Sequence, residues 1–323
     1  MIRSLLSVFR FCYLFIKSGK YSYARACWSL VGAFNNDIIR SVKVVKGSII
    51  YDDCILPVTK MNLLGNNLSK LAYFKKVFTI QNHADGLLFT HRTRPALRLI
   101  VRIPDNIGVI EEVFIHQLYR FEGVASCVVL DVGMNVGYAA IAFAEKQEVK
   151  HVFGFELVSE TDKWAEENFV LNTHVNQKIT HFPYGLDIDE KELEIPRAYT
   201  GAVGASATEF VIHDQQKKYS WNTLTTKVIV KDICTEIDKI KDSYKGVPLV
   251  VKLDCEGAEY GLIEKLHQQK RITDFSILMI EWHIKGPEPL LEILAINGYR
   301  SFAFDYPGEF RYGFIYAVKN GKD

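Results

Sequence analysis

The chain has 323 residues, of which 48% are hydrophobic and 24% are charged, and its formal net charge is +1. These values are typical of a globular protein with a buried core, and the balanced charge excludes a global field that would attract nucleic acid. The six cysteines are widely separated and include no C-x-x-C pair, which argues against a disulfide framework and against a zinc site. We therefore expect a cytoplasmic protein with free thiols and no nucleic-acid partner.

The first 45 residues are predicted to be mostly helical. Residues 4–16 are rich in aromatic and aliphatic residues but are interrupted by Arg10, and the stretch is shorter than the roughly 20 apolar residues of a transmembrane helix. Basic residues flank it, namely Arg3, Lys17, Lys20 and Arg25. We expect residues 1–45 either to pack as a helix on the main domain or to lie as a basic amphipathic helix on the inner face of a membrane.

Residues 46–104 contain short runs rich in β-branched and aromatic residues, such as YFKKVFTI at 73–80. Such runs predict a small β-rich layer, so residues 1–104 are expected to form an N-terminal helical and β-rich extension.

From residue 105 to 323, apolar strand-like runs alternate with helical segments. This alternation predicts an α/β domain with a doubly wound, mostly parallel sheet. The stretch 187–225 breaks the rhythm and is expected to be an inserted loop or hairpin.

The first motif follows the predicted strand 127–133 and reads Asp131-Val132-Gly133-Met134-Asn135-Val136-Gly137-Tyr138. Its two glycines allow a tight turn and the close approach of a ligand. Their G-x-x-x-G spacing does not meet the G-x-G-x-x-G fingerprint of a dinucleotide site. A carboxylate at Asp131 suits a cationic ligand better than a diphosphate. S-adenosylmethionine, which carries an ammonium and a sulfonium group, is such a ligand.

Glu156 ends the next predicted strand, 151–157. An acidic residue at the tip of the second strand, about 20 residues after a glycine loop, is placed to accept hydrogen bonds from ribose hydroxyls. Both S-adenosylmethionine and NAD carry such a ribose, so Glu156 alone does not distinguish the two cofactors.

The third motif begins near the end of the predicted strand 249–254 and reads Lys252-Leu253-Asp254-Cys255-Glu256-Gly257-Ala258-Glu259. Charges at the end of a buried strand are costly unless they are paired or used, although acids also stabilise the start of a helix. Glu281 and His283 end the following strand at the same edge. Asp254, Glu281 and His283 are therefore the candidates for a catalytic base. Asp254, Glu256 and Glu281 could instead bind a divalent metal, but acids clustered at a strand edge more often have other roles, and we expect no metal.

In their order and spacing, these segments resemble the FkbM family of methyltransferases. The resemblance covers about residues 105–300, and the sequences that carry it are IGVIEEVFIHQLYRF, LDVGMNVGYAAIAFA, VFGFELV, VVKLDCEGAEYGLIEKL and LMIEWH. It implies a seven-stranded Rossmann-like domain that uses S-adenosylmethionine to methylate hydroxyl groups, often on sugars or secondary metabolites. Two departures could narrow the cofactor pocket: Met134 replaces a small residue, and Leu-Val follows Glu156 where proline is common.

The resemblance also implies roles for individual residues. Those at the methionine end of the cofactor would be Asp131, Gly133, Asn135 and Gly137. Glu156 would hold the ribose, and Asp254 would stand beside the transferring methyl group. Tyr138 and Asp187 are assigned to the cofactor site as well.

The sequence thus predicts an O-methyltransferase whose acceptor is a hydroxyl group of a small molecule or glycan. One alternative is an NAD-linked oxidoreductase, against which the missing dinucleotide fingerprint and Asp131 argue. Another is a non-catalytic binding protein with a methyltransferase fold. The presence of Asp131, Glu156 and Asp254 argues against that alternative.

Overall fold

The computed structural model of the protein describes residues 43–197, 224–306 and 312–321, except for a few positions between 46 and 67. The chain divides into two compact units, Met1–Glu111 and Glu112–Asp323. The sequence places this division after residue 104, shortly before the boundary of the two units. The predicted N-terminal helix and its membrane contact span residues 1–45. Residues 1–42 lie outside the described residues, and residues 43–45 form a strand where a helix was predicted. Within the described ranges, no helix has both the length and the hydrophobicity to cross a membrane.

The first unit contains two antiparallel sheets of three strands each. One sheet consists of β1 (Lys43–Val45), β2 (Ser48–Tyr51) and β3 (Cys54–Pro57). The other consists of β4 (Phe78–His83), β5 (Gly86–His91) and β6 (Arg98–Val101). The run 73–80, predicted as a strand, is divided between α4 (Leu68–Val77) and β4. Its helical part buries Phe74 against Phe89 of β5, with ring centroids 6.0 Å apart.

The first unit ends with α5 (Asp105–Ile110), and one π-helical turn, Glu111–Ile115, follows it. The second unit is built on a sheet with the strand order β15-β16-β14-β13-β7-β8-β9. Its strands are β7 (Cys127–Val132), β8 (Val149–Phe155), β9 (Ile179–Phe182), β13 (Leu249–Leu253), β14 (Phe275–His283), β15 (Tyr299–Asp305) and β16 (Tyr312–Lys319). Neighbouring strands are parallel except where β16 pairs with β14 and β15. This arrangement confirms the predicted seven-stranded, mostly parallel sheet.

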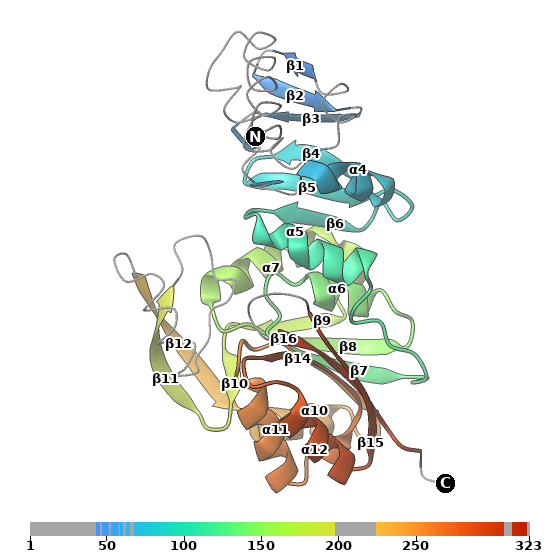
Figure 1. The fold of residues 1–323 in the computed structure, drawn as a ribbon, viewed down its shortest axis with the longest axis vertical. Coiled ribbons are helices and arrows are strands. Elements are labelled where there is room, and N and C mark those ends of the chain that lie inside the picture. The colour runs from blue at the N-terminus through green and yellow to red at the C-terminus, as the bar shows by residue number, and fades with distance from the viewer. Residues whose placement is uncertain are drawn as a thin grey trace, which may run out of the picture. The chain divides into compact units, whose positions relative to one another are not determined.

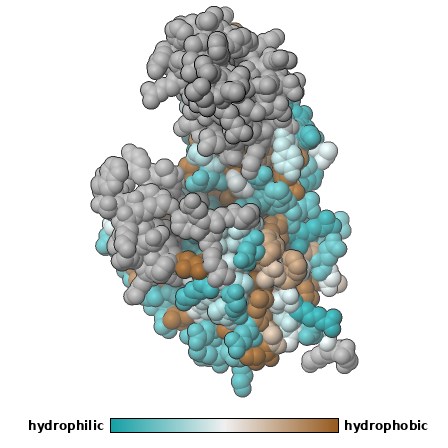
Figure 2. Space-filling view, viewed as in Figure 1, coloured by the Kyte–Doolittle hydropathy of each residue, from teal (hydrophilic) through white to brown (hydrophobic). Residues whose placement is uncertain are grey.

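Helices cover both faces of this sheet (Figure 1). On one face lie α6 (Tyr138–Ala144), α7 (Ser159–Leu171) and α8 (Thr173–Asn176); on the other lie α10 (Ile233–Ser243), α11 (Glu259–Gln268) and α12 (Glu288–Ile296). Because both faces are covered, every residue of β7 and β13 is buried, which explains why these strands are apolar except for Asp131 and Lys252. On the side seen in Figure 2, the described surface mixes hydrophilic and hydrophobic residues.

A second, smaller sheet carries the segment that interrupts the alternation of strands and helices. Its strands are β10 (Gly185–Asp187), β11 (Lys191–Arg197) and β12 (Leu224–Asp232). β12 is parallel to β10 and antiparallel to β11. The predicted insertion therefore has the strand pairing of a hairpin, and the residues that connect β11 to β12 lie outside the described ranges.

The strand order of the main sheet has its topological switch point between β7 and β13. From β7 the chain continues to β8 and β9 on one side, and from β13 to β14 on the other. In sheets of this type the crevice at the carboxyl ends of such a strand pair is where ligands bind. Gly133 and Asp254 come directly after these two strands, so the two glycine- and acid-containing motifs meet at this crevice.

Gly133 allows the loops after β7 and β13 to touch. Its φ is +78°, and a Cβ built on it would lie only 1.7 Å from the backbone oxygen of Asp254. The backbone N–H of Asp254 in turn donates to the oxygen of Val132 at 3.0 Å. A side chain at position 133 would therefore have to separate the two loops.

We predict that Gly133→Ala destabilises the protein more than Gly298→Ala does. Gly298 has a similar φ of +80°, but a Cβ there would meet no atom within 4 Å. Gly298→Ala therefore measures the cost of backbone strain alone. The steric clash should add about 1–3 kcal/mol to the loss of stability in Gly133→Ala. Urea unfolding of the two variants gives the free energies of unfolding to compare. Equal losses would show that the two loops separate without cost.

Candidate cofactor and catalytic site

A cleft lies at the carboxyl ends of β7, β8 and β13. It encloses about 650 Å³ of space, part of which is open to solvent. Its polar side chains come from Asn135, Glu156, Asp254 and Glu256. Its apolar side chains come from Val132, Phe155, Leu157, Leu186, Val230, Cys255 and Ala258. The cleft therefore combines an apolar wall with three carboxyl groups.

Four of the residues predicted to bind the cofactor line this cleft: Gly133, Asn135, Glu156 and Asp254. The other four do not line it. Gly137 has a φ of +81° and lies so close to α7 that a Cβ would be 2.5 Å from the ring of Phe169. Tyr138 is fully buried at the start of α6. Asp187 forms an ion pair with Lys191 at 2.8 Å.

Asp131 also lies behind the cleft, where it is fully buried against Lys252. The two residues occupy paired positions on β7 and β13, and the Lys252 ammonium lies 3.1 Å from Asp131 and 3.4 Å from Asp254. It also donates to the oxygen of Gly133 at 2.8 Å. Burial alone lowers the pKa of Lys252, but the two carboxylates outweigh it and keep the pKa above its ordinary value. The lysine therefore stays charged and neutralises the acidic residue that precedes the glycine loop.

Glu156 presents its carboxylate to the cleft from the end of β8. Its two oxygens accept the backbone N–H groups of Asn135, at 2.8 Å, and Val158, at 2.9 Å. Burial raises the pKa of Glu156 to about 7, against the opposing effect of these hydrogen bonds. Each oxygen has a second lone pair, so the carboxylate can still accept hydrogen bonds from a ligand.

The two departures from the family pattern have different outcomes. Met134 does not line the cleft, because its side chain packs on Gly154 of β8, where a Cβ would lie 2.1 Å from the Met134 sulfur. The possibility that Met134 narrows the pocket is therefore wrong. Leu157, which follows Glu156, does line the cleft.

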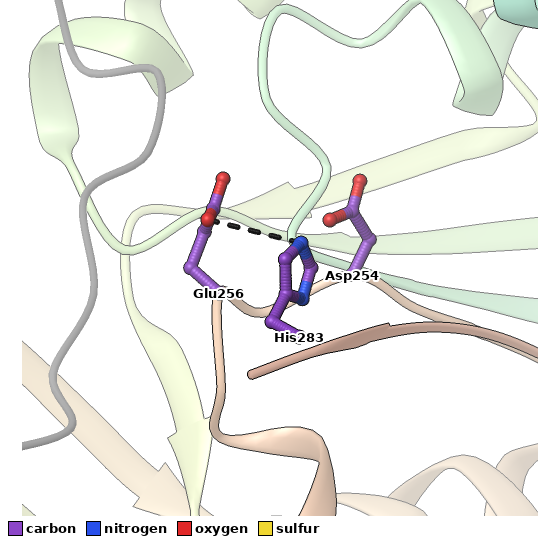
Figure 3. A group of neighbouring side chains, drawn as sticks. All are labelled: Asp254, Glu256 and His283. Atoms are coloured by element: carbon purple, nitrogen blue, oxygen red, sulfur yellow. Dashed lines mark ion pairs between the residues drawn. The ribbon is translucent and has the colours of Figure 1, made fainter. Parts of the chain in front are cut away.

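Asp254 and Glu256 of the cleft lining lie close to His283 (Figure 3), which does not itself line the cleft, and neither does Glu281. Asp254, Glu256 and His283 each offer a ligand atom, and these atoms all lie within 4.8 Å of one another. Nε2 of His283 is 3.8 Å from the Glu256 carboxylate, and its Nδ1 is 3.0 Å from that of Glu259. Burial lowers the pKa of His283, but Glu259, Glu256 and Asp254 outweigh it and raise the pKa to about 10. Three nearby carboxylates thus attract a cation, and the absence of a metal here remains a prediction.

Glu281 differs from the other two candidates for the base. It is 8% exposed and accepts a hydrogen bond from the Tyr119 hydroxyl at 3.2 Å. Burial, together with the charges of Asp254 and Glu112, raises its pKa well above the ordinary value.

The sequence did not single out the apolar wall of the cleft. Leu186 and Val230 come from β10 and β12 of the smaller sheet, and nothing in their local pattern indicates a ligand. The sequence indicates Glu256 only as a possible metal ligand and as a helix-start acid. It indicates Glu259, which contacts His283, only as such an acid. The spacing of His283 from the third motif along the chain gave no sign of that contact.

A Rossmann-like sheet with an acidic cleft at the switch between β7 and β13 is the architecture of a cofactor-binding transferase. A family model described as the methyltransferase FkbM domain matches residues 131–301. The chain therefore belongs to the FkbM methyltransferase family, and its cofactor is S-adenosylmethionine. The family and cofactor predicted from the sequence are confirmed. A search of curated proteins gives no match.

Several solved structures are similar to this chain. Methyltransferase FkbM from Methylobacillus flagellatus KT is 15% identical, with a TM-score of 0.42 over 64% of this chain and 47% of that one. This chain thus spans about half the length of that protein. An rRNA methylase from Streptococcus thermophilus is 11% identical, with a TM-score of 0.33; the match covers 61% of this chain and 88% of that one. M. capricolum TrmK, bound to S-adenosyl-homocysteine, is 13% identical, with a TM-score of 0.34; the match covers 64% of this chain and 67% of that one.

We predict that Lys252→Met destabilises the protein by about 3–5 kcal/mol, because it leaves the buried Asp131 carboxylate without its partner. Lys150→Met is the matched control, since Lys150 is exposed on β8, and it should change stability by about 0.5 kcal/mol or less. Denaturant unfolding measures both. Adding Asp131→Asn to Lys252→Met should recover part of the loss, because an amide is easier to bury than a charge. Equal stability of the two single variants would contradict the importance of this pair.

Proposed function

We propose that the protein methylates a hydroxyl group of a small molecule or glycan. The observation that carries this proposal is the meeting of Asp254 and Glu256, which line the cleft, with His283, which lies beside them. When bound, S-adenosylmethionine supplies a methyl group on a positively charged sulfur, which an acceptor oxygen can attack.

The residues of the cleft fit the cofactor chemically. Glu156 has lone pairs left for the two ribose hydroxyls, and the apolar wall of Leu157, Leu186 and Val230 suits the adenine ring. Asp254 and Glu256 suit the positively charged end of the cofactor, since opposite charges attract strongly in a partly buried cleft. Lys252 is already paired with Asp131 and Asp254, so the cleft retains an acidic character.

The same acidity disfavours other ligands. The diphosphate of NAD would face the carboxyl groups of Glu156, Asp254 and Glu256, which argues against the oxidoreductase alternative. A phosphodiester backbone would meet the same groups, and the net charge of +1 offers no compensating field. These features support a small or glycan acceptor, and the exclusion of nucleic acid remains a prediction.

His283 is the proposed base, and Asp254 the proposed partner of the cationic end of the cofactor. A base accounts typically for 10²–10⁴-fold in rate, and alignment of the reacting groups for up to about 7–11 kcal/mol. His283 can accept a proton only after losing its own. A cation beside it lowers its pKa, so we expect a value below 10 once the cofactor is bound.

We predict that Glu156→Ala weakens S-adenosylmethionine binding more than tenfold. Each charge-assisted hydrogen bond contributes about 1.5–3 kcal/mol, and 1.4 kcal/mol corresponds to a factor of ten in Kd. Glu166→Ala, which removes an exposed carboxylate from α7, should leave the Kd unchanged. Isothermal titration calorimetry gives both values. A folded Glu156→Ala protein that binds as tightly as wild type would refute the ribose assignment.

We predict that a carbon-13 methyl group from labelled cofactor appears on an acceptor oxygen, which NMR distinguishes from a methyl on nitrogen.

Asp254→Asn should fold and lose turnover. The wild-type rate should rise with pH as His283 loses its proton, and His283→Ala should lack this rise while keeping cofactor affinity. Methylation of nitrogen or carbon only would refute O-methylation. Wild-type turnover by Asp254→Asn would refute the mechanism.

A further inference from the structure

Glu259, the first residue of α11, is a fully buried carboxylate with three protein contacts. Its Oε1 accepts the backbone N–H of His283 at 2.7 Å and lies 3.0 Å from the His283 ring atom Nδ1. Its Oε2 accepts the backbone N–H of Gly257 at 2.8 Å. One side chain thus holds both the end of β14 and the loop that carries Asp254 and Glu256.

These contacts lie where the pairing between β13 and β14 stops. The last paired positions of the two strands are Leu253 and Ile280. Beyond that point β14 continues to His283, which pairs with Tyr312 of β16 on its other side. On the side of β13, no strand carbonyl among the described residues is paired with His283. Its backbone N–H therefore donates to the Glu259 carboxylate. Glu259 fixes the relative position of the two strand ends that form the acidic end of the cleft.

A stabilising effect on the start of α11 explains only part of this arrangement. An acid in the first turn of a helix interacts favourably with the helix dipole, and the bond from Gly257 belongs to this role. It does not require the other oxygen to contact both the backbone and the ring of His283. Burial of a carboxylate is costly unless it is fully hydrogen-bonded, so the contacts with His283 are what make the position tolerable.

We propose that Glu259 is a positioning residue that fixes the imidazole of His283, with its proton on Nδ1 and with Nε2 presented to Glu256 and Asp254, which line the cleft. A carboxylate that accepts the Nδ1–H bond sets the tautomer and the orientation of a histidine and stabilises its protonated form. Because the same oxygen also holds the backbone of His283, the ring cannot rotate without losing its partner. This inference rests on the proposed role of His283 as the base.

The charged groups that act on His283 come from three elements: Glu259 of α11, Asp254 and Glu256 of the loop after β13, and Glu281 of β14. Of these, Glu259 alone makes a direct hydrogen bond to the ring. Removing its charge while keeping its shape should therefore change which ring nitrogen of His283 carries the proton, an effect that a structural role at the start of α11 would not produce.

Nitrogen-15 NMR of the full chain with labelled histidine tests the proposal, in the presence of EDTA so that no metal competes for the ring. The sequence has nine histidines, and His283→Gln identifies the signal of His283. In wild type we expect the neutral ring of His283 to carry its proton on Nδ1. In Glu259→Gln this preference should weaken, because an amide can donate to Nδ1 as well as accept from it. Glu264→Gln, an exposed position on the same helix, should match wild type.

Two results would overturn the proposal. One is a wild-type His283 that carries its proton on Nε2 in the neutral form, which decides the matter even if Glu259→Gln does not fold. The other is a folded Glu259→Gln protein whose neutral His283 has the same proportion of the two tautomers as wild type. Cofactor titration of wild type is measured separately. Failure to bind S-adenosylmethionine would refute the proposed function, whereas the NMR result would still decide the role of Glu259.

Discussion

The buried ion pair between Lys252 and Asp131 is the interaction on which the site depends. It joins the two central strands at the level where their loops begin, and its lysine also holds the oxygen of Gly133 and the carboxylate of Asp254. A buried charge is tolerated only when it is paired and hydrogen-bonded. The pair therefore allows acidic residues to gather at the carboxyl edge of the sheet. The compensating positive charge, the Lys252 ammonium, is buried and does not line the cleft.

Around this pair, carboxylates are used mainly to hold backbone N–H groups at the ends of strands. Glu156 joins the end of β8 to the glycine loop through Asn135, and Glu259 joins the end of β14 to the loop after β13 through Gly257. At each end of the cleft a side chain thus continues the hydrogen bonding that the sheet no longer supplies. The rigid edge that results keeps the few groups with free lone pairs in fixed positions.

The fold was predictable from the sequence because apolar runs of strand length alternate with helical segments, and because buried parallel strands have a distinctive composition. The site was predictable only in part. Gly133, Glu156 and Asp254 follow strands directly, so the geometry of a parallel sheet brings them together. Asp131 forms an ion pair with Lys252, which lies more than a hundred positions away in the sequence. Neither motif alone predicts this pair. The apolar wall comes from a separate sheet, whose register no local pattern specifies.

The contact between the loops at Gly133 and Asp254 has an evolutionary consequence. Since even a methyl group at position 133 would collide with the backbone of the facing loop, sequence drift at this position requires a simultaneous change in the other loop. The part of the cleft that carries Glu156 and the part that carries Asp254 and Glu256 are therefore inherited as one unit. Outer turns such as the one at Gly298, where added atoms would meet open space, carry no such restraint and can diverge independently among descendants.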